Sequence, residues 1–251
     1  TLIKGRFGEL KNHIFNIGIK KVDAIFIDLG VSSMQLDTPE RGFSFRFDAP
    51  LDMRMDDSKT TVFDIVNDYK EKDLAKIIYL FGEERKSRRI ARNIIEYRKS
   101  KKIETTFELS NIIKNSIGGK YKKIHPSTKT FQGLRIYLND ELKELYQALI
   151  SSESILNEGG RLIVISFHSL EDRIVKNFIK YNSISEKKYK LEKTELPFYY
   201  KKKRVTKPSE TEIDKNPRSR SAHLRYAYRT SAKAALENNL NNFIRYGGVS
   251  V

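Results

Sequence analysis

Side chains that can steer a group-transfer reaction lie close together near the start of the chain. Asp28 directly follows an apolar run, and Ser32, Ser33 and Gln35 come soon after it. Carboxylate, hydroxyl and amide oxygens can accept hydrogen bonds from an amine, align it for attack and take up its proton. The same residue types also reverse the chain in an ordinary strand-to-loop turn. The residues alone leave both interpretations open.

A strand must position these side chains. Residues 22–27 form a short apolar run with β-branched and aromatic members, which predicts a strand covered on both faces of an α/β sheet. Ligands of open α/β sheets bind beyond the carboxyl ends of the strands, which is where Asp28 would stand. The run 161–167 predicts a second strand that ends at His168, and 221–229 predicts a last strand.

Helical periodicity occupies much of the remaining chain. Apolar residues at three- and four-residue steps predict helices over 10–17, between 60 and 116, and over 170–181, and one long helix that ends at Gly159-Gly160. We expect an α/β domain from 1–36 and 140–229, interrupted by a mainly helical insertion over 37–139. Residues 184–217 are expected to form a mobile loop. Residues 230–251 are expected to form a C-terminal tail that is frayed from Ala232 onward.

The charge of the chain favours a polyanionic partner. Its 251 residues include 48 Lys and Arg against 32 Asp and Glu, a formal net charge of +16. Binding to phosphates releases condensed counterions, so such an excess suits nucleic acid. A generally Lys-rich, solvated surface is the alternative, although the charge is concentrated in clusters. These clusters lie at residues 85–89, 99–102, 120–123 and 199–204.

Composition also excludes several classes of chemistry. The chain has no cysteine, which rules out disulfides, thiolate metal clusters and a thiolate nucleophile. Its four histidines lack metal-ligand spacing, so we expect no metal site. No apolar run is long enough for a membrane helix and Thr1 does not open a signal peptide, so we expect a cytoplasmic protein without a membrane partner.

Four long sequence blocks carry a family resemblance. They are Asp28-Leu29-Gly30-Val31-Ser32-Ser33 with 35–37, residues 40–45 with 50–56, residues 130–136 with 139–142, and residues 159–173 with 216–222. In this order they resemble the ribosomal RNA small subunit methyltransferase H family, also called MraW. The resemblance implies a Rossmann-like methyltransferase sheet. It also implies S-adenosylmethionine as cofactor and methylation of the exocyclic amino nitrogen of a cytidine in 16S rRNA, with the small ribosomal subunit as partner.

The same resemblance implies that the fold is N-terminally incomplete. Family members open with a strand and a Gly-rich loop that cradles the cofactor, and no such segment precedes Thr1. We expect roughly 70 residues of the family pattern to be missing, the size of two βα units. The alternative function is therefore a truncated, non-catalytic RNA-binding remnant of such an enzyme. The sequence makes no prediction about oligomeric state.

The resemblance also assigns roles to individual residues. It implies that Phe7, Asp28 and Gln35 contact the cofactor, and that Asp28, Ser32 and Ser33 form the catalytic group. Phe7 could equally be a core residue, and the two serines could simply cap the turn. The absence of cysteine agrees with a nitrogen target, because methylation of the neighbouring ring carbon normally proceeds through a cysteine adduct.

Other residues are candidates for contact with RNA. Each arginine among them could grip phosphate or pair with a nearby acid, and the histidine could touch substrate or serve as a hydrogen-bonded structural residue. Tyr199-Tyr200 with the basic residues 201–204, and the helical insertion, are further candidates. The individual candidates are Arg41, Arg54, Arg135, His168, Arg218 and Arg220.

Overall fold

The computed structural model describes residues 1–118, 125–201 and 205–249. Two compact units make up this chain. The first, called here the α/β unit, combines Thr1–Gly30 with Leu142–Gly248. The second, called here the helical unit, is formed by Val31–Glu141. Each unit has its own core and is described separately.

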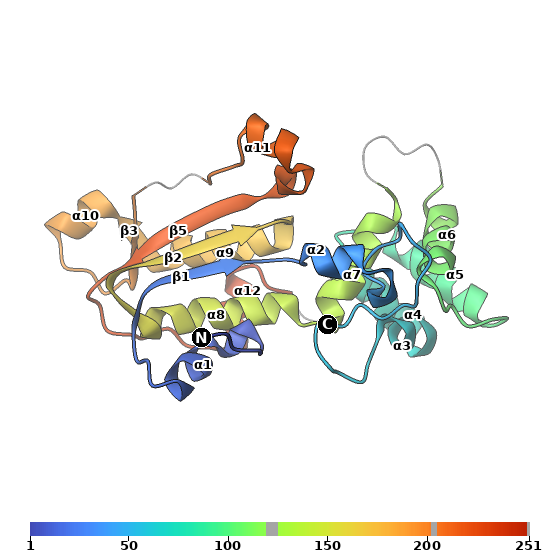
Figure 1. The fold of residues 1–251 in the computed structure, drawn as a ribbon, viewed down its shortest axis with the longest axis horizontal. Coiled ribbons are helices and arrows are strands. Elements are labelled where there is room, and N and C mark those ends of the chain that lie inside the picture. Colours follow the sequence, from blue (N-terminus) through green and yellow to red (C-terminus); the bar gives the residue numbers. More distant parts are fainter. Residues whose placement is uncertain (119–124, 202–204, 250–251) are drawn as a thin grey trace. The chain divides into compact units, whose positions relative to one another are not determined.

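The α/β unit is built on one five-stranded sheet in the order β1-β2-β5-β4-β3 (Figure 1). β1 pairs with β2 in parallel, β5 lies antiparallel to β2 and to β4, and β3 pairs with β4 in parallel. This arrangement confirms the predicted α/β class. The strands are β1 Val22–Asp28, β2 Leu156–Ser166, β3 Ser183–Ser185, β4 Phe198–Tyr200 and β5 His223–Arg229.

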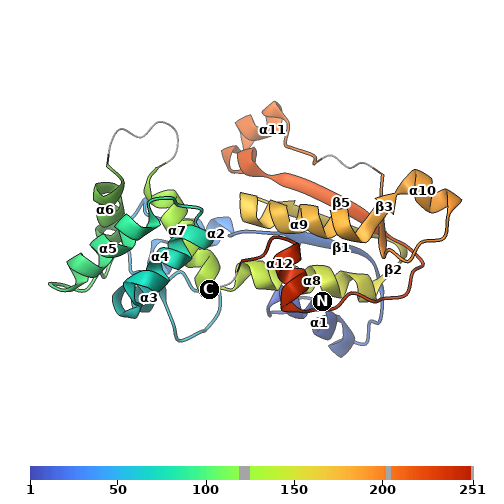
Figure 2. The same cartoon turned by 180° about the vertical axis from the view of Figure 1, so that it is seen from behind.

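Three helices of this unit, α8, α9 and α12, lie close to the sheet. α9 is behind the strands in Figure 1 and in front of them in Figure 2, and α8 and α12 lie below it in both views. Leu162, Val164 and Ala227 point from the strands into the buried layer, where Phe178 of α9 packs on Phe198 of β4. The helices are η1 Phe7–Glu9, α1 Leu10–Asn16, α8 Glu141–Ile155, α9 Ser169–Asn182, α10 Glu186–Leu191, α11 Glu210–Lys215, η3 Pro217–Ser221 and α12 Leu240–Arg245.

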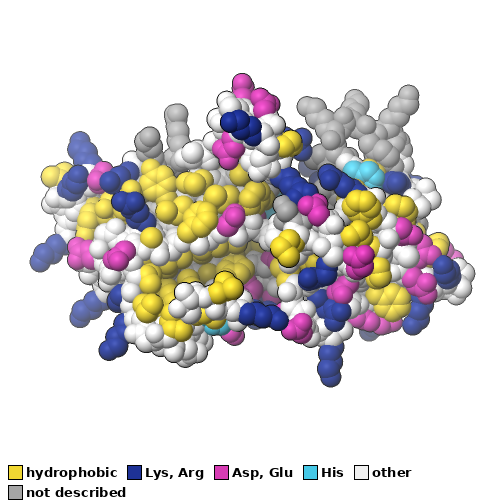
Figure 3. Space-filling model, viewed as in Figure 1, with side chains coloured by type: hydrophobic (Ala, Val, Ile, Leu, Met, Phe, Trp, Pro, Cys, Tyr) yellow, Lys and Arg dark blue, Asp and Glu magenta, His cyan; other side chains and the backbone are white. Residues whose placement is uncertain are grey.

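The prediction that β1 is covered on both faces is wrong for the described residues. Ile25 and Ile27 are buried, whereas the alternate residues Ala24, Phe26 and Asp28 are exposed. Phe26 leaves 59% of its surface accessible, a large fraction for an apolar side chain in the middle of a strand. Figure 3 shows hydrophobic side chains gathered over β1, β2 and β5 on this face. Composition could not reveal this, because both faces of β1 are apolar.

Two segments of this unit are more ordered than expected. The predicted mobile loop 184–217 contains β4, which pairs with β5, and helices α10 and α11. The tail is also anchored, because the buried Glu153 carboxylate accepts hydrogen bonds from the backbone of Ala235 and Leu236 at 3.0 and 2.8 Å. Tyr246 is 2% exposed and its hydroxyl accepts a hydrogen bond from Asn182. The expectation of a frayed appendage is therefore wrong as far as Gly248.

The helical unit begins with a short helix and continues as a bundle. Capping boxes start three of its helices, with Ser32, Thr61 and Thr105 as N-caps paired with Gln35, Asp64 and Glu108. The elements are α2 Ser33–Asp37, η2 Pro39–Arg41, α3 Val62–Asp68, α4 Glu71–Leu80, α5 Ser87–Arg98, α6 Thr106–Ile117 and α7 Ser127–Leu138.

The single long helix predicted before Gly159 is wrong. It is divided into α7, which ends at Leu138, and α8, which begins at Glu141. Asp140 has a φ of 53°, which an α-helix cannot accommodate. The Asn139 side chain donates to the backbone oxygens of Met53 and Arg135 and accepts from the Met55 N–H at 2.8 Å. This amide joins the end of α7 to the segment around Met53 and Met55.

Among the helices formed by the described residues, none combines the length and apolar character needed to cross a membrane.

Candidate functional site

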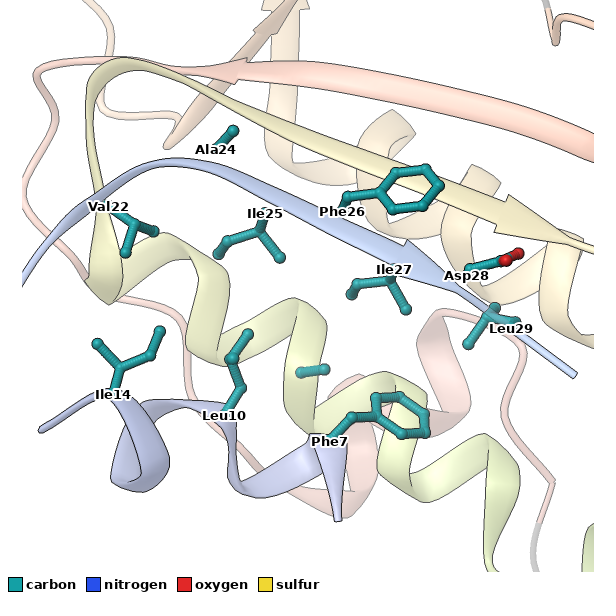
Figure 4. Close-up of a pocket in the computed structure, with 11 residues that line it drawn as sticks. Phe7, Leu10, Ile14, Val22, Ala24, Ile25, Phe26, Ile27, Asp28 and Leu29 are labelled. Atoms are coloured by element: carbon teal, nitrogen blue, oxygen red, sulfur yellow. The ribbon is translucent and has the colours of Figure 1, made fainter. Parts of the chain in front are cut away.

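A cavity of about 410 Å³ follows β1 in the α/β unit (Figure 4). Among the strands formed by the described residues β1 lies at the edge of the sheet, and it pairs with β2 on one side. Phe7 and Asp28 contribute an aromatic ring and a carboxylate to a lining that is otherwise aliphatic or aromatic. The lining residues are Phe7, Leu10, Ile14, Val22, Ala24, Ile25, Phe26, Ile27, Asp28, Leu29 and Ala148.

Asp28 is held at the carboxyl end of β1 with its side chain exposed. Pairing continues one residue beyond it, where the Leu29 N–H donates to the Ile165 oxygen at 3.1 Å. Gly30 then turns the chain with a φ of 96°, a conformation that favours glycine. The backbone is thus fixed on both sides of Asp28, while the carboxylate remains open to a ligand.

Phe7 sits in η1 and leaves 40% of its surface accessible beside the cavity. Its turn is fastened by Glu144 of α8, whose carboxylate accepts from the Gly8 N–H at 2.9 Å and pairs with Arg6 at 3.2 Å. A Cβ on Gly8 would lie 2.6 Å from Glu144 Oε2, so a larger residue here would displace the Glu144 side chain. Sequence reasoning missed Glu144; its signal is an acid within the apolar α8 pattern.

Ser32 and Gln35 form a capping box at the start of α2, in the helical unit. The Gln35 N–H donates to Ser32 Oγ at 3.2 Å, and the Ser32 N–H donates to Gln35 Oε1 at 2.9 Å. The capping alternative therefore describes Ser32. The predicted contacts of Ser32 and Ser33 with a target base, and of Gln35 with a cofactor, stay predictions.

Three candidate arginines are tied to neighbours inside the helical unit. Arg54 binds both oxygens of Asp52 at 2.7 and 2.8 Å, and Arg41 donates to the Arg54 backbone oxygen. The hydrogen bond from Arg54 holds the pKa of Asp52 below its usual range. Arg135 binds both oxygens of Glu141 at 2.7 and 2.8 Å. The structure thus gives all three a structural role, and their contact with RNA remains untested.

His168 serves as the N-cap of α9. Its Nδ1 accepts from the Glu171 N–H at 3.4 Å, and its Nε2 lies 3.0 Å from Glu171 Oε1. Only 10% of the imidazole side chain is exposed. The structural alternative accounts for this geometry, and contact of His168 with substrate stays a prediction.

Asp172 of α9 joins this helix to β5. It binds Arg225 at 2.7 and 3.0 Å and lies 3.5 Å from His223. Burial opposes ionisation of Asp172, but the hydrogen bonds and charge of Arg225 outweigh it and lower the pKa. This pair fixes the strand end beside His168.

Two further candidates, Arg218 and Arg220, lie in η3 with exposed side chains. Of the basic clusters predicted from the sequence, 120–123 lies outside the described residues, as do positions 202–204 of the cluster 199–204. Tyr199 of the last cluster is half-buried and stacks on Tyr228, with ring centroids 5.1 Å apart. Its aromatic face is therefore already used within the sheet.

The open α/β sheet, with a cavity that follows β1 as far as Asp28 at its carboxyl end, is consistent with a Rossmann-like methyltransferase fold. The chain belongs to the MraW methylase family, whose profile matches residues 1–230. This membership confirms the predicted family and the predicted class of enzyme, a methyltransferase.

Several proteins named ribosomal RNA small subunit methyltransferase H are similar to this chain. The one from Rhodopseudomonas palustris strain BisA53 is 47% identical over 241 residues, 94% of this chain and 73% of the relative. The one from Bradyrhizobium diazoefficiens is 46% identical over 253 residues, 99% of this chain and 77% of the relative. The one from Rickettsia canadensis is 50% identical over 215 residues, 83% and 70% of the two chains.

Proposed function

We propose that the protein transfers a methyl group from S-adenosylmethionine to the exocyclic amino nitrogen of a cytidine in 16S rRNA. Family membership and the names of the similar proteins support an rRNA methyltransferase of the small subunit. The observation that carries the proposal is the cavity along β1, with Phe7 and Asp28 in its lining. The substrate would place the reaction in the cytoplasm.

The residues of this cavity fit the cofactor chemically. The accessible Phe7 ring and the aliphatic side chains around it offer a surface on which an adenine ring can stack. The Asp28 carboxylate offers a negative charge for a cationic ligand. S-adenosylmethionine supplies a methyl group activated by a positively charged sulfur. Gln35 is a proposed further contact, on the basis of the family resemblance alone.

Asp28 also has the chemistry needed for the nucleophile. The amine of cytosine is a poor nucleophile, because its lone pair is delocalised into the ring. An accepting carboxylate orients the N–H bonds and favours the positive charge that grows on nitrogen as the N–C bond forms and the S–C bond of the donor breaks. It can then take up the proton that the nitrogen loses. We propose this role for Asp28, with Ser32 and Ser33 as further acceptors for the base. The helical unit is proposed to help recognise the RNA.

Nucleoside analysis tests this function directly. The protein expressed from its gene is incubated with small ribosomal subunits and S-adenosylmethionine carrying a ¹³C methyl group, and the digested 16S rRNA is analysed by chromatography and mass spectrometry. We expect the label in N4-methylcytidine at a single site. Label in a ring-carbon-methylated cytidine, in another nucleoside or in no nucleoside contradicts the proposal.

One observation favours the alternative of a non-catalytic RNA-binding remnant. Within the described residues, β1 is paired on one side only and one sheet face is uncovered. Calorimetry on the 251-residue chain separates the two functions. Saturable heat with S-adenosylmethionine supports the enzyme, whereas salt-dependent RNA binding without cofactor heat supports the remnant.

A further inference from the structure

A second, larger cavity belongs entirely to the helical unit. This cavity, called here the α4/α5 cleft, has a volume of about 740 Å³ and is bounded by α4, α5 and the turn between them. Its size falls within the roughly 300–1,000 Å³ of ligand pockets. It is lined by Glu71, Lys72, Ala75, Lys76, Tyr79, Arg85, Ser87, Arg88 and Arg92.

The cations of the cleft form two rows. Lys72 and Lys76 are one helical turn apart on α4, and Arg88 and Arg92 are one turn apart on α5. Arg85 precedes α5 and extends the second row. All five side chains are exposed, and in the described ranges no ion pair involves any of them. The lining contains one acid, Glu71.

The packing of the two helices explains why the rows face a common space. Leu74 and Ile78 of α4 and Ile90 and Ile94 of α5 are fully buried, which turns the polar sides of both helices outward along the shared cleft. Ala75 and Ser87 are the small lining residues, and Ser87 is buried. Long basic side chains on either side of small ones leave a recess rather than a flat surface.

This concentration of unpaired positive charge has an electrostatic cost, because like charges within a Debye length repel one another. A polyanion relieves that repulsion and releases its own counterions when it binds. Arginine forms bidentate hydrogen bonds with phosphate, and the cleft contains three arginines. The charge pattern therefore fits a chain of phosphates better than a single carboxylate.

The presence of Tyr79 favours a nucleic acid over other polyanions as the ligand of the cleft. It lies on the Lys76 side of the cleft and leaves 57% of its surface accessible. Exposed aromatic rings beside cations stack the unpaired bases of single-stranded RNA. Binding to an anionic membrane would instead favour a convex surface with several apolar anchors, whereas this surface is concave and Tyr79 is its one aromatic residue.

We propose that the α4/α5 cleft binds the phosphodiester backbone of a single-stranded segment of the RNA substrate, with Tyr79 stacking on one of its bases. The proposal rests on the proposed function for the identity of the RNA. The cleft acts by raising affinity and fixing the position of the RNA, and it takes no part in the methyl transfer itself.

Charge-matched double variants test the cleft. Arg88→Ala with Arg92→Ala removes two cleft cations, and Lys99→Ala with Lys101→Ala removes two exposed cations of the same unit that pair with Glu96 and Glu108 outside the cleft. We expect the cleft variant to bind 16S rRNA about tenfold more weakly, with a salt slope smaller by about 1.4–2. The control variant should stay within about twofold of the wild type.

Tyr79→Ala tests base stacking separately from charge, because it removes the aromatic ring and no cation. We expect it to weaken binding to single-stranded RNA about tenfold with an unchanged salt slope. Cofactor binding by calorimetry and the rate at saturating RNA should be unchanged in all these variants, because none of these side chains lines the β1 cavity. Thermal melting confirms that each variant is folded.

Three outcomes would contradict RNA binding by the cleft. The first is an equal loss of RNA affinity in both double variants, and the second is wild-type RNA affinity in the cleft variant. The third is a cleft variant that loses binding to phosphatidylglycerol vesicles but keeps its RNA affinity. The proposed function fails separately. In one such result, the wild type methylates no cytidine while the cleft variant, unlike the control variant, loses RNA affinity. That result would support the RNA-binding role of the cleft and contradict the proposed reaction.

Discussion

Replacing Asp28 by alanine is expected to lower the methyl-transfer rate at least about 100-fold, the usual loss when a positioned catalytic group is removed. Affinity for 16S rRNA should stay within about twofold, because one carboxylate contributes little to binding a polyanion. The change should leave the fold intact. Asp28 is exposed, and the neighbouring backbone is fixed by β1 pairing and by the Leu29 hydrogen bond.

Asp23→Ala is the matched control, since Asp23 lies on the same strand but outside the cavity lining. Single-turnover rates with small ribosomal subunits and a filter-binding titration with 16S rRNA give the two readouts. Asp28→Asn separates charge from hydrogen bonding, because the amide keeps one acceptor oxygen. Turnover by Asp28→Ala at the wild-type rate would remove Asp28 from the mechanism.

Gly133→Ala should destabilise the helical unit strongly. A Cβ at Gly133 would lie 2.7 Å from the Gly82 backbone nitrogen and 3.0 Å from its Cα. α7 and the turn that follows α4 therefore meet backbone to backbone, and an added methyl group must push them apart. Alanine gains about 1 kcal/mol in helix propensity over glycine, but overpacking against backbone costs about 1–3 kcal/mol or more. The contact is with rigid backbone, which places the cost at the upper end of this range, so we expect the free energy of unfolding to fall by about 2 kcal/mol.

Urea denaturation followed by circular dichroism measures this loss. The control is Gln132→Ala, which changes the preceding, half-buried residue of the same helix. It should change the free energy of unfolding by less than about 1 kcal/mol. A stabilised Gly133→Ala protein would show that propensity outweighs the close contact, which would contradict the packing described for α4 and α7.

Local sequence signals predicted the elements whose causes are local. The apolar run 22–27 predicted β1, and Thr105 with Glu108 marks the start of α6 as a capping box does. The break between α7 and α8 was missed because it depends on Asn139, which bonds to Met53 and Met55 far back in the chain. Periodicity alone does not register such a contact.

In the candidate site, too, some residues could be predicted from the sequence, and others depend on contacts with residues far away in the chain. Family motifs directed attention to Asp28 and Phe7, which line one cavity of the α/β unit. The residue that fastens the Phe7 turn, Glu144, was not predicted, because its partner Gly8 lies 136 positions away. Arg54 and Arg135 carry the residue type that binds phosphate, yet each is paired with an acid. The residue type alone does not reveal whether an arginine is paired with an acid inside the protein.

The central claim is that the cavity along β1 receives the methyl donor. A crystal structure of the protein expressed from its gene, with S-adenosylhomocysteine bound, tests it most directly. We expect the adenine ring against Phe7 and the homocysteine sulfur at the Asp28 end of β1. Electron density for the ligand elsewhere, with Phe7 and Asp28 both uncovered, would contradict the account.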